Sequence, residues 1–190
     1  MHEFPDVSPD DIKGLLLTGF SADEVRAILK AGFTYAHSQA ILNRIRIAQR
    51  DPHGADRLGL TVVQVRDLVN RVSVAVTSSR EERRLEGRVA RVLIGDLVSF
   101  NRKIVDLATG DVIGEIDVET SNAIIEVTTD KNDKLEQVLR EKNDERINPQ
   151  GKPVVLCAPN YSRAADAQFG SYGIPVIRTF KDLFDYLRRL

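Results

Sequence analysis

The chain has a single cysteine and only three histidines among its 190 residues. One cysteine can make neither a disulfide within the chain nor the cysteine set of a zinc site. Cys157 lies in the apolar run 154–158 and is expected to be a buried strand residue. His2, His37 and His53 lack the spacing of metal ligands, and all precede the C-terminal half, which excludes a serine–histidine pair there.

An excess of charge of either sign is also lacking, since the net charge is −1. A protein that coats nucleic acid non-specifically would need a basic surplus. A nuclease is not excluded, because an acidic metal site offsets basic residues elsewhere. No apolar run approaches the length of a membrane span, and the N-terminus lacks the pattern of a signal peptide. We therefore expect the chain to work in a reducing, aqueous compartment.

Residues 1–77 have the pattern of an all-helical module. Ser21 followed by Glu24 predicts a capping box at a helix start. The motif Gly19-Phe20-Ser21 recurs forty residues later as Gly59-Leu60-Thr61, which suggests a small bundle of two similar helical hairpins. The module has either a packing or delivery role or a role in binding nucleic acid or a partner. Its balanced acidic and basic residues favour the first of these.

From residue 78 the pattern becomes α/β, so residues 78–190 are expected to form a second domain. The order predicts a mixed β-sheet flanked by helices, because an antiparallel meander is followed by strand–helix–strand crossovers. The expected elements are a helix (80–93), three strands (97–107, 112–119 and 123–129), a helix (134–146), a strand (152–158), a helix (163–169), a short strand (174–178) and a final helix (179–190).

Two carboxylates, Asp117 and Glu126, interrupt the apolar residues of the second and third predicted strands. A carboxylate inside a buried strand is costly unless it is neutralised, and a hard divalent cation is the usual way to neutralise two. The alternative is that both lie exposed on the outer face of a hairpin, which is common for these residue types. The apolar neighbours of Glu126, at 124, 125 and 127, favour burial and therefore a metal site.

With this element order, residues 78–190 resemble the PD-(D/E)XK nuclease superfamily, which has an α-β-β-β-α-β core. The residues that carry the resemblance are Glu86, Asp117, Glu126-Val127-Thr128 and Gln137. The chain is most similar to the C-terminal nuclease domains of contact-dependent growth inhibition and related polymorphic toxins. Their strands carry a similar Gly-Glu-Ile-Asp … Ile-Ile-Glu-Val run before a helix that starts like Lys134-Leu135-Glu136-Gln137.

The resemblance implies a metal-dependent endonuclease that hydrolyses phosphodiester bonds in RNA, such as tRNA, or in DNA. It implies Mg²⁺ or Mn²⁺ as the cofactor, with Glu86, Asp117 and Glu126 as the metal ligands. It also implies a tight protein inhibitor, an immunity protein, that covers the cleft. The site of action would be cytoplasmic, and the chain would be part of a secreted toxin.

One position departs from the family pattern. A lysine normally follows the glutamate by two residues, but here that position is Thr128, and threonine cannot stabilise charge as an ammonium group does. We expect Lys134 to reach the site instead, because one helical turn separates it from Gln137. Lys131 in the preceding loop is the second candidate.

Two other hypotheses stay open. Thr128 motivates a non-catalytic module that binds nucleic acid or protein on a degenerate nuclease fold. A different α/β protein would carry Asp117 and Glu126 on its surface. Among secondary candidates, Glu115 and Glu119 share the face of Asp117. If Asp117 is a ligand, one of them could line the cleft, but the favoured expectation is that both lie in solvent at the strand ends. Tyr161 and Arg178 follow later strands, whose ends line clefts in a doubly covered sheet, so they are candidates for phosphate contact.

Overall fold

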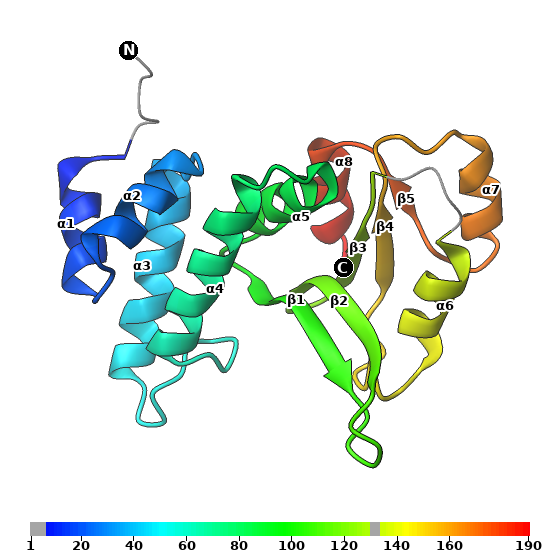
Figure 1. Ribbon diagram of the computed structural model, residues 1–190, viewed down its shortest axis with the longest axis horizontal. Helices are drawn as coiled ribbons and strands as arrows, with labels where there is room; N and C mark the ends of the chain where they lie inside the picture. The colour runs from blue at the N-terminus through cyan, green and yellow to red at the C-terminus, as the bar shows by residue number, and fades with distance from the viewer. Residues whose placement is uncertain (1–6, 130–133) are drawn as a thin grey trace. The chain divides into compact units, whose positions relative to one another are not determined.

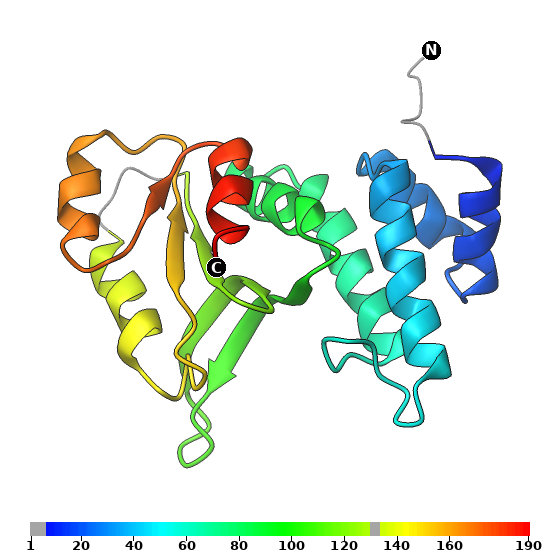
Figure 2. The same cartoon turned by 180° about the vertical axis from the view of Figure 1, so that it is seen from behind.

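The computed structural model describes residues 7–129 and 134–190. Within these residues the chain has eight helices and one five-stranded mixed sheet, which confirms the predicted α/β class with a mixed sheet (Figures 1 and 2). The chain divides into two compact units, Met1–Val98 and Ser99–Leu190. None of the helices in the described ranges is long and apolar enough to cross a membrane.

The first unit is helical. Its helices are α1 (Pro9–Leu17), α2 (Ala22–Lys30), α3 (Tyr35–Arg50), α4 (Val62–Val76) and α5 (Glu81–Val92). Helix α5 crosses α4 closely at Gly87, where an added Cβ atom would lie 2.5 Å from the backbone nitrogen of Val76. The sequence grouped α5 with the sheet, whereas the structure places this helix in the helical unit.

Three helices of this unit begin after the same short motif of glycine, an apolar residue and serine or threonine. The copies are Gly19-Phe20-Ser21, Gly32-Phe33-Thr34 and Gly59-Leu60-Thr61. Each glycine has a positive φ, between +72° and +96°, which glycine adopts without strain. The third residue of each copy is the N-cap of α2, α3 or α4. The sequence analysis found only the first and third copies. With the middle copy, the motif occurs three times.

The second unit holds the sheet, in the strand order β1-β2-β3-β4-β5. Strands β2 and β3 are antiparallel, and β4 is parallel to both β3 and β5. Helices α6 and α7 lie on one side of the sheet and α8 on the other (Figures 1 and 2). The elements are β1 (Leu97–Val105), β2 (Val112–Thr120), β3 (Ile124–Val127), α6 (Leu135–Asn143), β4 (Val154–Cys157), α7 (Ala164–Gly170), β5 (Val176–Ile177) and α8 (Phe180–Leu187).

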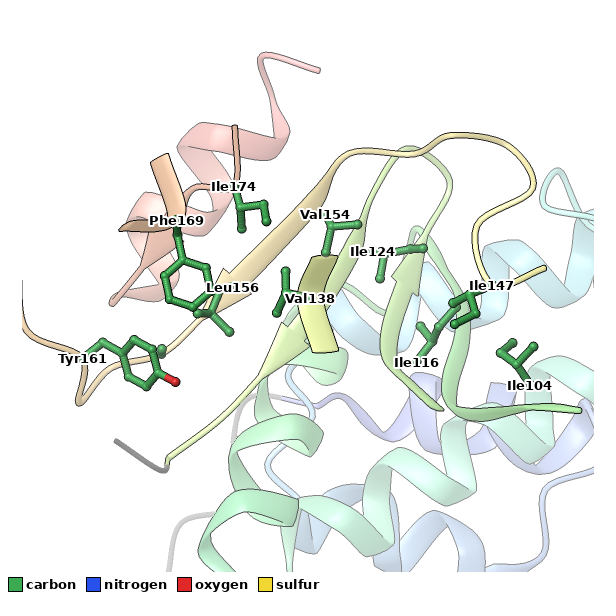
Figure 3. Packing of buried hydrophobic residues seen from close by; sticks show 11 residues of the cluster. Ile104, Ile116, Ile124, Val138, Ile147, Val154, Leu156, Tyr161, Phe169 and Ile174 are labelled. Atoms are coloured by element: carbon green, nitrogen blue, oxygen red, sulfur yellow. The ribbon is translucent and has the colours of Figure 1, made fainter. Parts of the chain in front are cut away.

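An apolar core under α6 and α7 fixes the middle of the sheet. Val138 of α6 and Phe169 of α7 pack with Ile124 of β3 and Leu156 of β4 (Figure 3). Every residue of β3 and β4 is buried, which confirms the burial predicted for β3 and for Cys157. Side chains alternate along a strand, so Glu126 shares the face of Ile124 and points toward α6.

Candidate active site

Asp117 and Glu126 lie together where β2 and β3 stop pairing as a regular ladder. The register pairs Val118 with Ile125. Just beyond it, Oδ2 of Asp117 accepts a hydrogen bond from the backbone N–H of Val127 at 2.9 Å. The Glu126 side chain is only 1% exposed. The alternative with both carboxylates on the outer surface is therefore wrong.

Helix α6 brings an amide and an ammonium group to Glu126. Nε2 of Gln137 donates to Glu126 Oε1 at 2.6 Å. Nζ of Lys134 lies 3.3 Å from the same oxygen and donates to Gln137 Oε1 at 3.1 Å. The structure thus places Lys134 beside the glutamate, as the sequence predicted. Lys131 lies outside the described residues.

The structure adds a third carboxyl group, Glu141, which the sequence analysis missed. Glu141 follows Gln137 by one helical turn, and Nε2 of Gln137 donates to Glu141 Oε1 at 3.1 Å as well as to Glu126. Its side chain is buried, with 1% of the residue exposed. Its position could have been predicted from the sequence, because Glu141 follows Gln137 by four residues and residues four apart lie on one face of a helix.

Burial and neighbouring charges disfavour the ionisation of Glu126 and Glu141. Burial and the charge of Glu141 raise the pKa of Glu126 to about 8, with the charge of Lys134 partly opposing the shift. Burial raises the pKa of Glu141 to about 7, and the charge of Asp117 adds to this.

The donor chemistry of this cluster suits a hard divalent cation. Oε2 of Glu126 and Oε2 of Glu141 are buried and, among the described residues, have no hydrogen-bond donor. Three carboxylates and one ammonium would carry a net charge of −2, which a divalent cation neutralises. No three acidic, histidine or cysteine side chains in residues 7–129 and 134–190 are already gathered around one point. A cation would therefore compete with Gln137 and Lys134 for Glu126 Oε1.

Thr128 and Glu86 are the other two predicted site residues. Thr128 is fully buried, with 0% exposed, and its backbone N–H donates to the carbonyl of Cys157 at 3.0 Å. Glu86 lies on α5 in the first unit, is 8% exposed, and has Arg83 Nη1 3.6 Å from its Oε2. Its assignment as a metal ligand stays a prediction.

Glu119 is not in solvent, so that expectation is wrong. The residue is 8% exposed, and its carboxylate accepts from Lys152 Nζ at 2.8 Å, Ser99 Oγ at 2.8 Å and Arg102 Nη2 at 2.9 Å. This network, not a cleft, accounts for the residue. Lys152 follows Glu119 by 33 positions, and sequence spacing gives no sign of such a contact.

Arg178 makes hydrogen bonds that stabilise the loop between β4 and α7. Its guanidinium donates to the carbonyls of Tyr161 at 2.8 Å and Ser162 at 2.6 Å, and to Asp166 at 2.7 Å. These three bonds hold the segment between β4 and α7. They give Arg178 a structural role in place of the phosphate contact considered for it.

No protein-family model, curated protein or solved structure matches this chain.

Proposed function

We propose that the chain is a metal-dependent endonuclease that hydrolyses phosphodiester bonds in nucleic acid. One observation carries the proposal: Gln137 joins the buried glutamates Glu126 and Glu141, Lys134 lies beside Glu126, and Asp117 is bonded to the backbone N–H of the residue that follows Glu126. The resemblance to PD-(D/E)XK nucleases supports it, because Asp117 and Glu126 occupy the two strand positions of that motif.

The residues of the cluster divide the work. Asp117 and Glu126 would hold Mg²⁺ or Mn²⁺, and Glu141 would add a ligand to the set for which Glu86 was also predicted. Once bound, the cation would supply an activated water and neutralise charge on the phosphate. Gln137 orients both glutamates through its amide. Lys134 keeps a positive charge at the site, which the family pattern would place at position 128.

The substrate is RNA such as tRNA, or DNA, and a cleavage experiment distinguishes the two. Purified protein would be incubated with total tRNA and, separately, with supercoiled plasmid, in Mg²⁺, Mn²⁺ or chelator. We expect cleavage of one substrate with metal, none with chelator, and none with Asp117→Ala. Asp111→Ala, which changes an exposed aspartate in the turn before the same strand, should cleave like the wild type. Cleavage that survives Asp117→Ala would refute the proposal.

A second candidate is a non-catalytic module that binds nucleic acid or protein. The observation that favours it is Thr128, which is fully buried where the family pattern has a lysine. It predicts that the protein slows the migration of labelled tRNA or plasmid in a gel-shift assay in the absence of metal, and that neither nucleic acid is cleaved. For both candidates, the resemblance to toxins implies a protein inhibitor that covers Asp117 and Glu126. The Asp117→Ala protein, which is expected to be inactive, can be used in an affinity purification to search for that inhibitor.

A further inference from the structure

A cavity of about 430 Å³ opens beside the C-terminal end of β4 in the second unit. This size lies within the range of small-molecule sites, about 300–1,000 Å³. The carboxyl cluster and the mechanism above do not use it. The lining includes Asn160, Tyr161, Ser162, Ala164, Gln168 and Phe169.

The lining has an apolar floor and a polar, uncharged rim. Tyr161 and Phe169 are buried, with ring centroids 6.0 Å apart, and both belong to the core in Figure 3. Asn160, Ser162 and Gln168 are exposed and carry amide or hydroxyl groups. Within the described part of the chain, no charged side chain lines the cavity. The two rings are tilted by 54°. A neutral ligand with an apolar body and with donors and acceptors on its edge fits these walls better than an anion does.

A nucleobase has these properties. Its faces are apolar and stack on flat side chains, a contribution of about 1–3 kcal/mol per base. Its edges pair with amide side chains, as Asn and Gln do with adenine. Bases become available to such a cavity in single strands, loops and bulges, where they are not paired.

A hydrogen bond connects the lining of the cavity to the segment that follows β3, the strand that carries Glu126. Nδ2 of Asn160 donates to the carbonyl of Thr129 at 2.9 Å, and Glu126 is aligned with Leu156 of β4. Thr129 follows Glu126 by three residues, which is roughly 10 Å along an extended chain. A nucleic-acid strand covers that distance in roughly three stacked nucleotides, at ~3.4 Å each.

We propose that this cavity binds one unpaired nucleobase of the substrate, close to the phosphodiester that the carboxyl cluster attacks. The inference rests on the proposed function, and it makes the substrate a single-stranded region or loop. Asn160 and Gln168 would read the edge of the base, and Tyr161 and Phe169 would form the floor under its face.

The test is nucleotide binding to the full chain in chelator, measured by saturation-transfer NMR. The probes are AMP, GMP, CMP and UMP, with ribose 5-phosphate as the base-free control. We expect saturation of the base protons of at least one nucleotide and none of ribose 5-phosphate. Ala164→Trp, which fills the cavity, should weaken that binding roughly tenfold or more. Ala167→Trp, an exposed position on the same helix outside the lining, should stay within about twofold.

Three results would overturn the inference: binding of ribose 5-phosphate as well as of the nucleotides, no nucleotide binding at all, or an equal effect of Ala164→Trp and Ala167→Trp. Because the assay needs neither metal nor cleavage, it is separate from the nuclease test. Protein that binds bases but does not cut would refute only the nuclease proposal, and protein that cuts without binding bases would refute only the cavity proposal.

Discussion

Glu119 and Glu126 are buried glutamates on neighbouring strands of one sheet, yet their surroundings are opposite. Although burial opposes it, hydrogen bonds from Lys152 and Ser99 hold the pKa of Glu119 below its usual value. Around Glu126, burial and the charge of Glu141 raise the pKa to about 8. The Glu119 carboxylate is fully hydrogen-bonded within the protein, whereas among the described residues Glu126 Oε2 has no hydrogen-bond donor.

The difference separates a structural carboxylate from a functional one. A buried charge that is paired and hydrogen-bonded stabilises the local fold, and its removal leaves an uncompensated partner. A buried cluster of like charges destabilises the fold and persists where it serves a site. We infer that the Glu126 cluster is of the second kind, and the predictions below test this division.

The largest expected effect is on activity. Glu126→Gln should lower the initial rate of metal-dependent cleavage by roughly 10³-fold or more, because it removes a charge that holds the cation facing the phosphate. Glu119→Gln should keep the rate per folded molecule, with the folded fraction taken from circular dichroism. Equal losses in the two variants would break the comparison.

For the free energy of unfolding, we expect the larger loss from substitution of Glu119 and not from substitution of Glu126. Glu119→Ala should lower the free energy of unfolding by about 3–5 kcal/mol, because Lys152, whose side chain is 9% exposed, keeps a buried charge without its partner. Urea denaturation measures this change. Glu115→Ala, at a half-buried position on the same strand, is the control and should stay within about 1 kcal/mol. A loss for Glu119→Ala no larger than for the control would contradict the structural role.

Removal of the functional charge should stabilise the protein. At pH 8 in chelator, Glu126→Gln should raise the free energy of unfolding by about 1–3 kcal/mol, because a carboxyl with a raised pKa is costly to ionise in the folded state. Denaturant titrations at pH 8 test the sign. A loss of stability would mean that Glu126 is held by its partners as firmly as Glu119 is.

The smallest expected effect is on the pH dependence of the melting temperature. The folded state keeps protons on Glu126 and Glu141 that the unfolded chain releases above about pH 4.5. Their contribution is therefore fully present below that pH and is lost as the pH rises through about 7 and 8. In chelator the melting temperature should fall over this window, and the double variant Glu126→Gln/Glu141→Gln should fall less steeply. Identical slopes would contradict the raised pKa values.

Much of the fold could be predicted because its signals are local. The capping box of Ser21 and Glu24 marks the start of α2, and the apolar run around Glu126 marks a buried strand. Lys134 could be expected at the site because it is one turn from Gln137. These inferences need only helix and strand periodicity, which neighbours in the sequence display.

The rest depends on contacts between distant parts of the chain. Glu119 could not be assigned as structural, because Lys152 comes from the start of another strand. The cavity by α7 also depends on tertiary packing, since its floor joins Tyr161 and Phe169 across a loop. Glu141 is different: its spacing from Gln137 was readable, but a lone glutamate on a charged helix looks like a solvent-facing residue.

Direct titration of Mn²⁺ into metal-free protein tests the central claim, that the Asp117–Glu126–Glu141 cluster is a cation site. At pH 7.5, electron paramagnetic resonance of free Mn²⁺ would give the affinity for the wild type, Asp117→Ala and Glu119→Gln. The account predicts one site in the wild type and in Glu119→Gln, with affinity at least roughly tenfold weaker in Asp117→Ala. Equal affinity in all three proteins, or no binding to the wild type, would contradict it.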